Sequence, residues 1–466
     1  MRTSSATLAL ASYLLASADA INLLQRRDGV PPSVVHHKIQ RRHVENPIAH
    51  DRARRMRRSD TVQVSLANEE TLYFMDVSIG TPAQAMKLHI DTGSSDLWTN
   101  VANSAYCESS ANTCLGGTYN ANDSSTYKYL NSDFNITYVD GSGAVGDYVE
   151  DTVQFSGVTL KEQVFGIGYQ SSSQEGLIGI GYPSNEAAVS YGFKPYANVP
   201  VSLVNQGYIK TNAYSLWLDD LESSTGSILF GGVDTARYTG KLETLPIVKT
   251  DGVVYADFII ALTEVGYGGN QGSIATNLNV GAILDSGSSL MYLPDQVAQK
   301  IFDQVGAQYN SRTGAAVVDC NVANSDDTID FTFSSPTISV ALSEIILEVG
   351  QNQCILGIGL AGDSTPVLGD TFLRSAYVVY DISSNEISIA QTDFSGKSSN
   401  VLEITGNSIP SATSVSNAVT SVVQASGAVN VGFSSTAASS HGAAPTAPVG
   451  YNLALLGAAG AAIFAL

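Results

Sequence analysis

The sequence is poor in the side chains that many hydrolytic and metal-dependent enzymes need. Beyond residue 58 it contains two histidines, His89 and His441, and the whole chain has four cysteines. A serine or cysteine nucleophile ordinarily needs a histidine base, and zinc needs clustered Cys or His ligands. Neither a Gly-x-Ser-x-Gly elbow nor a His-Glu-x-x-His motif occurs. We therefore expect carboxylate chemistry, with no metal and no cofactor.

Basic residues are also scarce outside the N-terminal segment. Residues 1–58 carry eleven Lys and Arg and four Asp and Glu, whereas the rest carries 12 basic and 39 acidic residues, a net charge of −27. So acidic a body argues against nucleic-acid binding. It fits a protein that works at acidic pH, although solubility alone would also explain the charge.

Long hydrophobic runs and long helical patterns are missing from the body of the chain. Short alternating segments separated by Gly, Pro, Asn and Asp turns predict strands from about residue 71 to 391. Only Val201–Gln206 and Asp295–Gln304 have helical periodicity. The 466 residues exceed one compact core, so we expect a β-rich monomer with an N-terminal lobe at 59–245 and a C-terminal lobe at 246–394.

An internal repeat is the most informative pattern. An apolar run leads into Asp-Thr-Gly-Ser-Ser at 91–95, and a near copy, Asp-Ser-Gly-Ser-Ser, begins 194 residues later at 285. A second apolar strand ends in Gly179, 88 residues after the first Asp, and in Gly369, 84 residues after the second. We expect each Gly-ended strand to support one Asp loop, with the two loops facing each other.

Two carboxylates brought together in this way have a specific chemistry. They cannot both ionise easily, so they share a proton and titrate as a pair. One can then act as a general base on water while its protonated partner polarises a carbonyl group. Asp91 and Asp285 would thus hydrolyse peptide bonds of polypeptide substrates without a covalent intermediate.

The first 58 residues have the pattern of processing segments. Residues 1–20 have a basic start, an apolar stretch and Ala18-Asp19-Ala20, which predicts a signal peptide. Residues 21–58 are basic and contain four Arg-Arg pairs, the last at 57–58. We expect a propeptide that a processing protease removes at dibasic sites, with the mature chain beginning near Ser59.

The C-terminal end predicts attachment to the cell surface. Residues 395–442 are rich in Ser, Thr, Ala and Gly, as in an extended glycosylated stalk. Small residues, a spacer and an apolar tail within 443–466 predict a glycosylphosphatidylinositol signal, with attachment at Gly442 or Ser440. A weak transmembrane anchor is the alternative. The N-glycosylation sequons begin at Asn122 and Asn135.

Several further stretches complete a known pattern. They are Asp91–Trp98, Ile136–Tyr138, Asp151–Val153, Gly176–Gly179, Phe230–Asp234, Asp285–Ser289 and Val367–Arg374. Over about residues 70–393 the chain resembles the pepsin-type aspartic proteases, and most closely the fungal membrane-anchored yapsins and secreted candidapepsins. This resemblance implies an all-β, bilobal fold with a cleft between two pseudo-symmetric lobes.

The resemblance also implies roles for individual residues. Asp91 and Asp285 match the catalytic pair, and Ser94 and Ser288 match hydroxyls that hydrogen-bond the outer carboxylate oxygens. Gly93 and Gly287 match positions where substrate backbone runs close. Tyr138 matches the tyrosine of the flap, a β-hairpin that closes over substrate, and Trp98 matches the tryptophan that contacts this tyrosine. Ser289 is predicted to be a further substrate-binding residue.

The four cysteines allow three pairings, of which nearest-neighbour pairing keeps each bridge within one half of the chain. The family likeness implies the same bridges, Cys107–Cys114 and Cys320–Cys354. Secretion would make disulfides stable.

The flap departs from the family pattern, because Val139 stands where Gly is usual. Asp140 could there pair with a basic residue on the acyl side of the scissile bond, although Asp140-Gly141 could equally be a hairpin turn. Overall we expect an anchored, acid-active endopeptidase on the extracellular side of the membrane. The alternative is a non-catalytic cell-wall or adhesion glycoprotein on the same scaffold.

Overall fold

The structure is a computed structural model of the chain, in which part of the sequence is described. The described residues are 33–44, 70–104, 106–108, 114–138, 142–223, 225–250, 252–350, 353–406 and 408–423. The signal peptide, the flap residue Asp140 and the attachment sites Ser440 and Gly442 lie outside these ranges. Within them, no helix is both long and apolar enough to cross a membrane.

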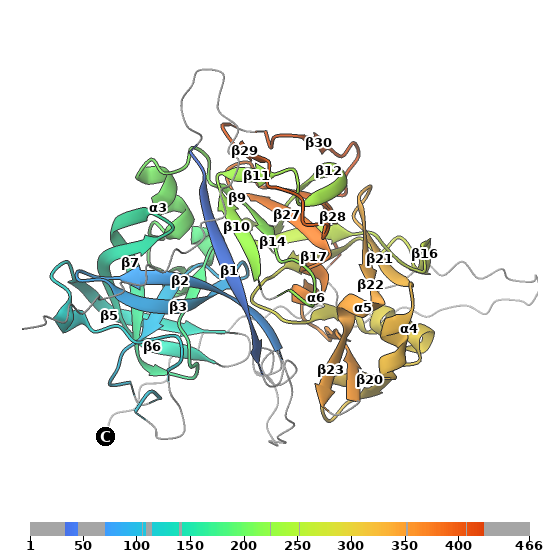
Figure 1. Cartoon of the computed structure of the whole chain (residues 1–466), viewed down its shortest axis with the longest axis horizontal. Helices are drawn as coiled ribbons and strands as arrows, with labels where there is room; N and C mark the ends of the chain where they lie inside the picture. The colour runs from blue at the N-terminus through green and yellow to red at the C-terminus, as the bar shows by residue number, and fades with distance from the viewer. Residues whose placement is uncertain are drawn as a thin grey trace, which may run out of the picture. The chain divides into compact units, whose positions relative to one another are not determined.

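Strands dominate the described part of the chain (Figure 1), as the sequence predicts. The α-helices are short: α2 (Ala187–Ser190), α3 (Val199–Asn205), α4 (Asp295–Val305), α5 (Leu342–Ile345) and α6 (Asp370–Leu373). The two predicted helical segments correspond to α3 and α4, so those predictions are confirmed. α4 ends at Gly306, whose φ of 74° is the left-handed conformation that glycine adopts readily.

One large sheet contains strands from both halves of the chain. Its strands are β1 (Val35–Val44), β2 (Glu70–Ile79), β3 (Gln84–Asp91), β4 (Leu97–Asn100), β5 (Lys128–Thr137), β6 (Gly143–Phe155), β7 (Val158–Ser171), β8 (Leu177–Gly179), β9 (Ala213–Trp217), β10 (Thr225–Phe230), β12 (Tyr238–Pro246), β27 (Ala376–Asp381), β28 (Glu386–Thr392) and β30 (Ala412–Ser414). The neighbouring pairs β9–β10 and β27–β28 join the two halves through the antiparallel contact of β9 with β27.

Smaller sheets build most of the C-terminal half. The sheet that carries the second Asp loop contains β13 (Val248–Thr250), β14 (Val254–Leu262), β17 (Val280–Leu284), β18 (Met291–Leu293), β25 (Ile358–Leu360) and β26 (Val367–Leu368). The other sheets contain β15 (Glu264–Tyr267), β16 (Asn270–Ala275), β21 (Thr328–Thr332) and β22 (Thr337–Ala341); β19 (Gln308–Asn310), β20 (Ala315–Val318), β23 (Ile346–Gly350) and β24 (Gln353–Leu356); and β11 (Gly232–Asp234) with β29 (Val401–Glu403).

The two Asp loops are supported by the same strand arrangement. β3 pairs in parallel with β8, so that Asp91 lies opposite Gly179, and β8 pairs antiparallel with β4. In the second half, β17 pairs in parallel with β26, and β26 pairs antiparallel with β18. The predicted Gly-ended strand beside each Asp loop is therefore confirmed.

Glycine is required where these supporting strands end. A Cβ atom on Gly179 would lie 2.5 Å from the backbone nitrogen of Ser95, and one on Gly369 would lie 2.2 Å from the Ser288 carbonyl oxygen. Both distances are shorter than any stable contact, so a side chain at either position would displace the adjoining Asp loop.

A buried ion pair joins two short helices of the C-terminal half. Arg374, at the end of α6, is fully buried and donates from Nε to Glu344 Oε2 of α5 at 3.1 Å. Its guanidinium group also donates to the Glu344 carbonyl oxygen. The same carboxylate accepts a hydrogen bond from the Leu221 backbone N–H.

We expect Arg374→Met to lower the free energy of unfolding by about 3–5 kcal/mol, because it leaves the Glu344 charge buried without its partner. Urea denaturation at pH 5 measures this loss. Lys128→Met is the matched control, since it breaks the exposed Lys128–Glu150 pair, which water screens, and it should lower the free energy of unfolding far less. Equal losses in the two variants would contradict the assigned role of Arg374.

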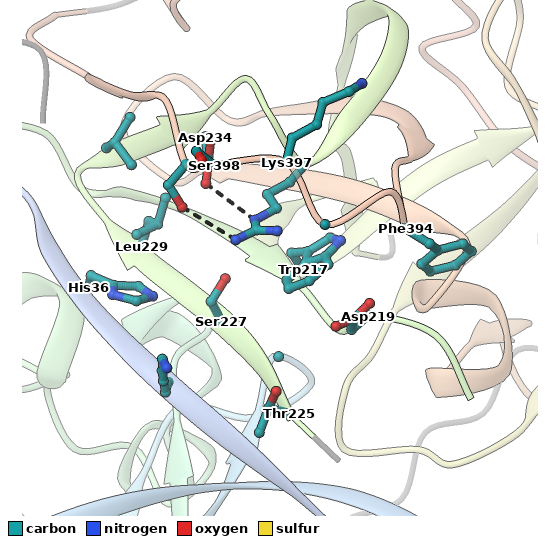
Figure 2. Close-up of a pocket in the computed structure, with 16 residues that line it drawn as sticks. His36, Trp217, Asp219, Thr225, Ser227, Leu229, Asp234, Phe394, Lys397 and Ser398 are labelled. Atoms are coloured by element: carbon teal, nitrogen blue, oxygen red, sulfur yellow. Dashed lines mark hydrogen bonds and ion pairs between the residues drawn. The ribbon is translucent and has the colours of Figure 1, made fainter. Parts of the chain in front are cut away.

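The basic N-terminal segment contributes one strand to the large sheet. β1 lies between β10 and β2 and pairs antiparallel with both (Figure 1). Its inward-facing side chains, Val35, His37 and Ile39, are buried. On the other face, His36 lines a pocket of about 460 Å³ together with Trp217 and the 394–401 segment (Figure 2).

Part of the predicted stalk packs against the body, so the expectation of an extended segment from residue 395 is wrong for the described residues up to 423. β29 pairs with β11, and β30 pairs with β12. Val401, Ile404 and Ile409 are buried. These apolar side chains and the backbone pairing hold a segment whose Ser- and Thr-rich composition resembles that of an unpacked chain.

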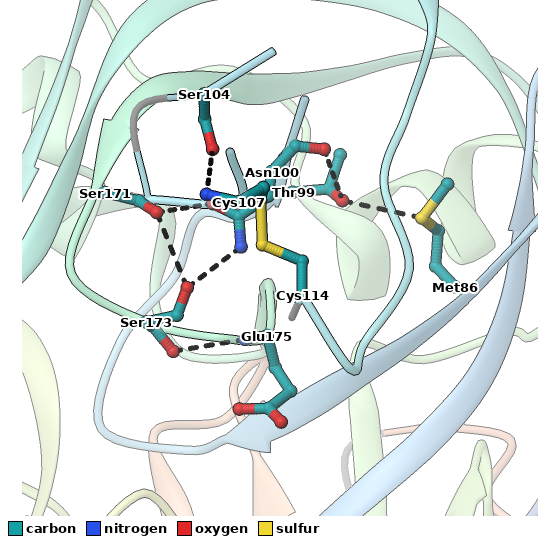
Figure 3. Close-up of a disulfide and its surroundings, with 9 residues drawn as sticks. All are labelled: Met86, Thr99, Asn100, Ser104, Cys107, Cys114, Ser171, Ser173 and Glu175. Carbon is teal, nitrogen blue, oxygen red and sulfur yellow. Dashed lines mark hydrogen bonds between the residues drawn. A yellow bond between two sulfur atoms is a disulfide. The ribbon is translucent and has the colours of Figure 1, made fainter. Parts of the chain in front are cut away.

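Both predicted disulfides, Cys107–Cys114 and Cys320–Cys354, are formed. The first lies beside the end of β4, where Ser104 Oγ accepts a hydrogen bond from the Cys107 backbone N–H (Figure 3). The second closes a loop of 34 residues between η3, a 3₁₀ helix at Cys320–Asn324, and β24.

Candidate active site

The Asp91 carboxylate is held by donors from its own loop. Oδ1 accepts the Gly93 backbone N–H at 2.7 Å, and Oδ2 accepts the Ser94 hydroxyl at 2.6 Å. The carboxylate is 3% exposed, so these hydrogen bonds replace most of its hydration.

The Asp285 carboxylate has the same partners at matching positions. Oδ1 accepts the Gly287 backbone N–H at 2.8 Å, and Oδ2 accepts the Ser288 hydroxyl at 2.7 Å. The sequence predicted the serine contacts of both loops from the family resemblance, and the structure contains both.

The loops are also bonded to each other through the residues that follow each Asp. The Ser286 backbone N–H donates to Thr92 Oγ1 at 2.9 Å, and the Thr92 N–H donates to Ser286 Oγ at 3.2 Å. Thr92 Oγ1 donates in turn to the Leu284 carbonyl oxygen, and Ser286 Oγ to that of Ile90. No role for these two hydroxyls was predicted from the sequence, although the Asp-Thr/Ser-Gly repeat contains them.

The two carboxylates face the same space. A Cβ atom on Gly93 would lie 2.5 Å from Asp285 Oδ1, so the first loop passes directly against the second carboxylate. Asp285 Oδ1, which accepts the Gly287 N–H, is thus the inner oxygen of its carboxylate, and we infer the same for Asp91 Oδ1 from its matching hydrogen bonds. This geometry requires Gly93 because any larger side chain would enter the space between the carboxylates.

Tyr138 and Trp98 meet as predicted. Trp98 Nε1 donates to the Tyr138 hydroxyl oxygen at 2.7 Å. Tyr138 follows β5 and its backbone N–H donates to the Ser142 carbonyl oxygen, which closes the hairpin from β5 to β6. Residues 139–141, including Asp140, lie outside the described part of the hairpin.

Ser289 and the two glycosylation sites complete the predicted set. Ser289 is 1% exposed, and its carbonyl oxygen accepts the Thr371 backbone N–H. Asn122 is exposed on η1, a 3₁₀ helix at Ala121–Asp123, and Asn135 is half-buried on β5.

A second pair of carboxylates is buried beside Tyr148 and Tyr196, and the sequence did not predict it. Asp96 accepts hydrogen bonds from the hydroxyls of Tyr148 and Tyr196 and from the Ala187 backbone N–H. Glu186 is 1% exposed and accepts the Tyr196 N–H at 2.8 Å. Burial raises the pKa of Asp96, and burial together with the nearby Asp96 charge raises the pKa of Glu186 to about 9.

Among the described residues, no group of three or more His, Cys, Asp or Glu side chains is arranged so that it could hold a metal ion. What the site presents is two carboxylates with matched hydrogen-bond partners on adjoining loops. Such a pair can bind and activate a water molecule between its oxygens.

Two Asp-Thr/Ser-Gly loops that face each other in a double-lobed β fold define an aspartic-type endopeptidase. Residues 72–392 match the family described as eukaryotic aspartyl protease, and the chain belongs to that family. The predicted bilobal, pepsin-like fold is confirmed, because the chain resembles the crystal structure of the aspartic proteinase from Irpex lacteus. That match has a TM-score of 0.60 and 22% identity and covers 78% of this chain and 100% of the other.

Two fungal relatives are similar over most of their length. The protein named "Probable aspartic-type endopeptidase opsB" of Aspergillus oryzae is 51% identical over 409 residues, which are 84% of this chain and 83% of that protein. Secreted aspartic protease 8 of Candida albicans is 39% identical over 346 residues, 73% of this chain and 80% of that protein. The chain is accordingly an aspartic-type endopeptidase.

Proposed function

We propose that Asp91 and Asp285 form the catalytic pair of this endopeptidase. The observation that carries the assignment is the matched hydrogen bonding of the two carboxylates, with glycine N–H groups on the inner oxygens and serine hydroxyls on the outer ones. The Thr92–Ser286 bonds hold the two loops in one arrangement.

Hydrolysis then follows from a shared proton. The ionised carboxylate takes a proton from the water between the inner oxygens while the protonated one donates to the carbonyl oxygen of the scissile bond. The new C–O bond gives a tetrahedral diol. The carboxyl group that took the proton from water then donates it to the amide nitrogen, while the other carboxylate takes a proton from the diol. The C–N bond breaks, a carboxyl group forms on one peptide and an amine on the other, and the two peptides separate. Fixed donors around both carboxylates reduce the reorganisation that this requires.

Tyr138 and Trp98 position the hairpin that covers the substrate. The Trp98 N–H donates to the tyrosine hydroxyl oxygen and thereby fixes the position of the Tyr138 ring at the end of β5. The hairpin would close over an extended polypeptide and exclude water from the reacting bond.

The test is cleavage of a diverse peptide library at pH 3–7 by the processed protein, beside Asp285→Asn. We expect cleavage by the wild type, fastest at acidic pH, and none above background by the variant. Identical product patterns would refute the assignment. They would leave the second candidate function, a non-catalytic wall or adhesion glycoprotein, which the intact carboxylate geometry disfavours.

Asp140 would favour a basic residue at the cleavage site. An acidic side chain two residues after Tyr138 could pair with Lys or Arg on the acyl side of the scissile bond. We expect Asp140→Ala to lower kcat/KM about tenfold for peptides with Lys there and to leave Leu peptides nearly unchanged. Asp133→Ala, exposed on β5 of the same hairpin, is the control. An equal loss for Lys and Leu peptides would mean that Asp140 serves only the turn.

The basic leader would keep the chain latent until a processing protease cuts it after Arg58. One supporting observation is that β1, which belongs to this leader, lies inside the large sheet. A second is that Arg42 of β1 forms an ion pair with Glu175, and its Cζ atom lies 4.9 Å from the Phe74 ring centre. A chain with its last two Arg pairs (54–55 and 57–58) changed to Ala should be secreted nearly inactive. Full activity of the uncut chain would exclude latency.

The chain would act outside the cell, as a monomer held by a lipid anchor at Gly442 or Ser440. The name of the Candida albicans relative as a secreted protease supports export, and the C-terminal signal supports the anchor. Treatment of intact cells with a phosphatidylinositol-specific phospholipase should release the protein. Retention after treatment would contradict a lipid anchor.

A further inference from the structure

The strand that leads to Asp285 has one face in the core and one outside it. Ala282 and Leu284 are fully buried in the main core cluster. Because side chains alternate along a strand, Gly281 and Ile283 lie on the opposite face, where Asp285 follows them. Ile283 is only partly buried. This face of β17 therefore leads from Gly281 to Asp285. The length of chain between the two residues is about 13 Å, at a rise of ~3.3 Å per residue.

A pocket of about 780 Å³ lies against this face. Its lining is mostly apolar and includes Ile259, Pro366, Val422 and Val423. Ile259 on β14 is the cross-strand neighbour of Ile283. The volume is ample for a large apolar side chain and its adjoining backbone.

The pocket wall on β14 is linked to the Asp91 loop through neighbouring side chains. Asp257 lies two residues before Ile259 and thus on the same face of β14. Asn185 Nδ2 donates to the Gly93 carbonyl oxygen at 3.2 Å and to Asp257 Oδ1 at 3.4 Å. Ile259 in the pocket wall is therefore two residues from Asp257. The Asn185 side chain links the Asp257 carboxylate to the Asp91 loop.

The outer wall comes from the segment that follows the protease body. The Val423 backbone N–H donates to the Asn279 carbonyl oxygen at 2.9 Å, and Val423 forms a parallel bridge with Val280. A Cβ atom on Gly281 would lie 3.2 Å from Val422 Cγ2. Glycine at 281 thus leaves room for the Val422 side chain, which packs against β17 at the rim of the pocket.

We propose that residues 420–423 complete a substrate subsite, which takes a large apolar side chain of the polypeptide two to four residues from the scissile bond. The C-terminal segment is then part of the specificity machinery as well as a connection to the anchor. The inference rests on the endopeptidase activity and is independent of the role proposed for Asp140.

The test is a comparison of wild type and Val422→Trp on peptides varied one position at a time, up to four residues on each side of the scissile bond. The indole would fill the pocket. At one position on one side, the kcat/KM ratio of Phe or Leu peptides to Ala peptides should fall about tenfold or more. The ratios at the other positions should stay within about twofold of the wild type.

Val422→Ser tests the same wall by removing it, and it should also weaken the Phe and Leu preference at that position. Val317→Trp, 47% exposed on β20 of a separate sheet, is the control for a surface indole. Unchanged ratios in both Val422 variants, a uniform loss at all positions, or a wild type without an apolar preference there would overturn the proposal. Failure of the endopeptidase assignment would look different, because the wild type would then cleave none of the peptides.

Discussion

Asp91→Asn is expected to lower kcat by about 10⁴-fold or more, the usual loss when one member of a catalytic unit is removed. An amide cannot take the proton from the attacking water. It also cannot share a proton with Asp285, so neither half of the acid–base exchange can proceed. KM should change little, because the substitution preserves the shape of the loop.

The amide keeps enough hydrogen bonds to preserve the fold. Its oxygen can still accept the Gly93 N–H, and its nitrogen can donate to the Ser94 hydroxyl, which both donates and accepts. The melting temperature should therefore remain within a few degrees of the wild type. Asp133→Asn, an exposed change on β5, should keep full activity. More than a tenth of the wild-type kcat in Asp91→Asn would contradict the assigned role.

The free energy of unfolding is expected to fall by several kcal/mol between pH 5 and pH 9, largely through Glu186. The pKa of this buried carboxyl is about 9 in the folded chain, against 4.5 for an ordinary glutamate. A raised pKa means that the folded chain holds a proton that the unfolded chain releases. The stability from Glu186 is thus complete below pH 4.5 and is lost as the pH rises toward 9.

Glu186→Gln should remove most of this pH dependence, because a neutral amide has no proton to lose. It should be nearly as stable as the wild type at pH 4 and more stable, by several kcal/mol, at pH 8. Urea denaturation followed by tryptophan fluorescence across this range measures both. Glu222→Gln, on an exposed turn, is the matched control. A variant with the same slope as the wild type would show that other groups set the alkaline limit.

The sequence predicted the parts of the site that local patterns encode. An apolar run into Asp-Thr/Ser-Gly specifies a strand and a turn within a few residues, and a second run ending in Gly specifies the supporting strand. The facing of Asp91 and Asp285 followed from the repeat of both patterns in one chain. The family resemblance supplied the contact of Trp98 with Tyr138, which no local pattern indicates.

What the sequence did not predict depends on contacts between distant segments. Glu186 lies 90 residues from Asp96 in a loop without periodicity, so only the folded chain reveals that both carboxylates are buried together. Residues 395–423 were misread for a related reason. Their composition resembles an unpacked stalk, but backbone pairing and a few spaced apolar side chains are sufficient to hold them against the body.

The central claim is that Asp91 and Asp285 act as one unit, and a double-variant cycle measures this most directly. Residual kcat is determined for Asp91→Asn, Asp285→Asn and the chain carrying both, with each chain's melting temperature checked. If the two carboxylates share one proton and one water, the double variant should be within about tenfold of either single variant. If the losses of the two single variants instead multiply, each Asp contributes independently, and the shared-proton account is wrong.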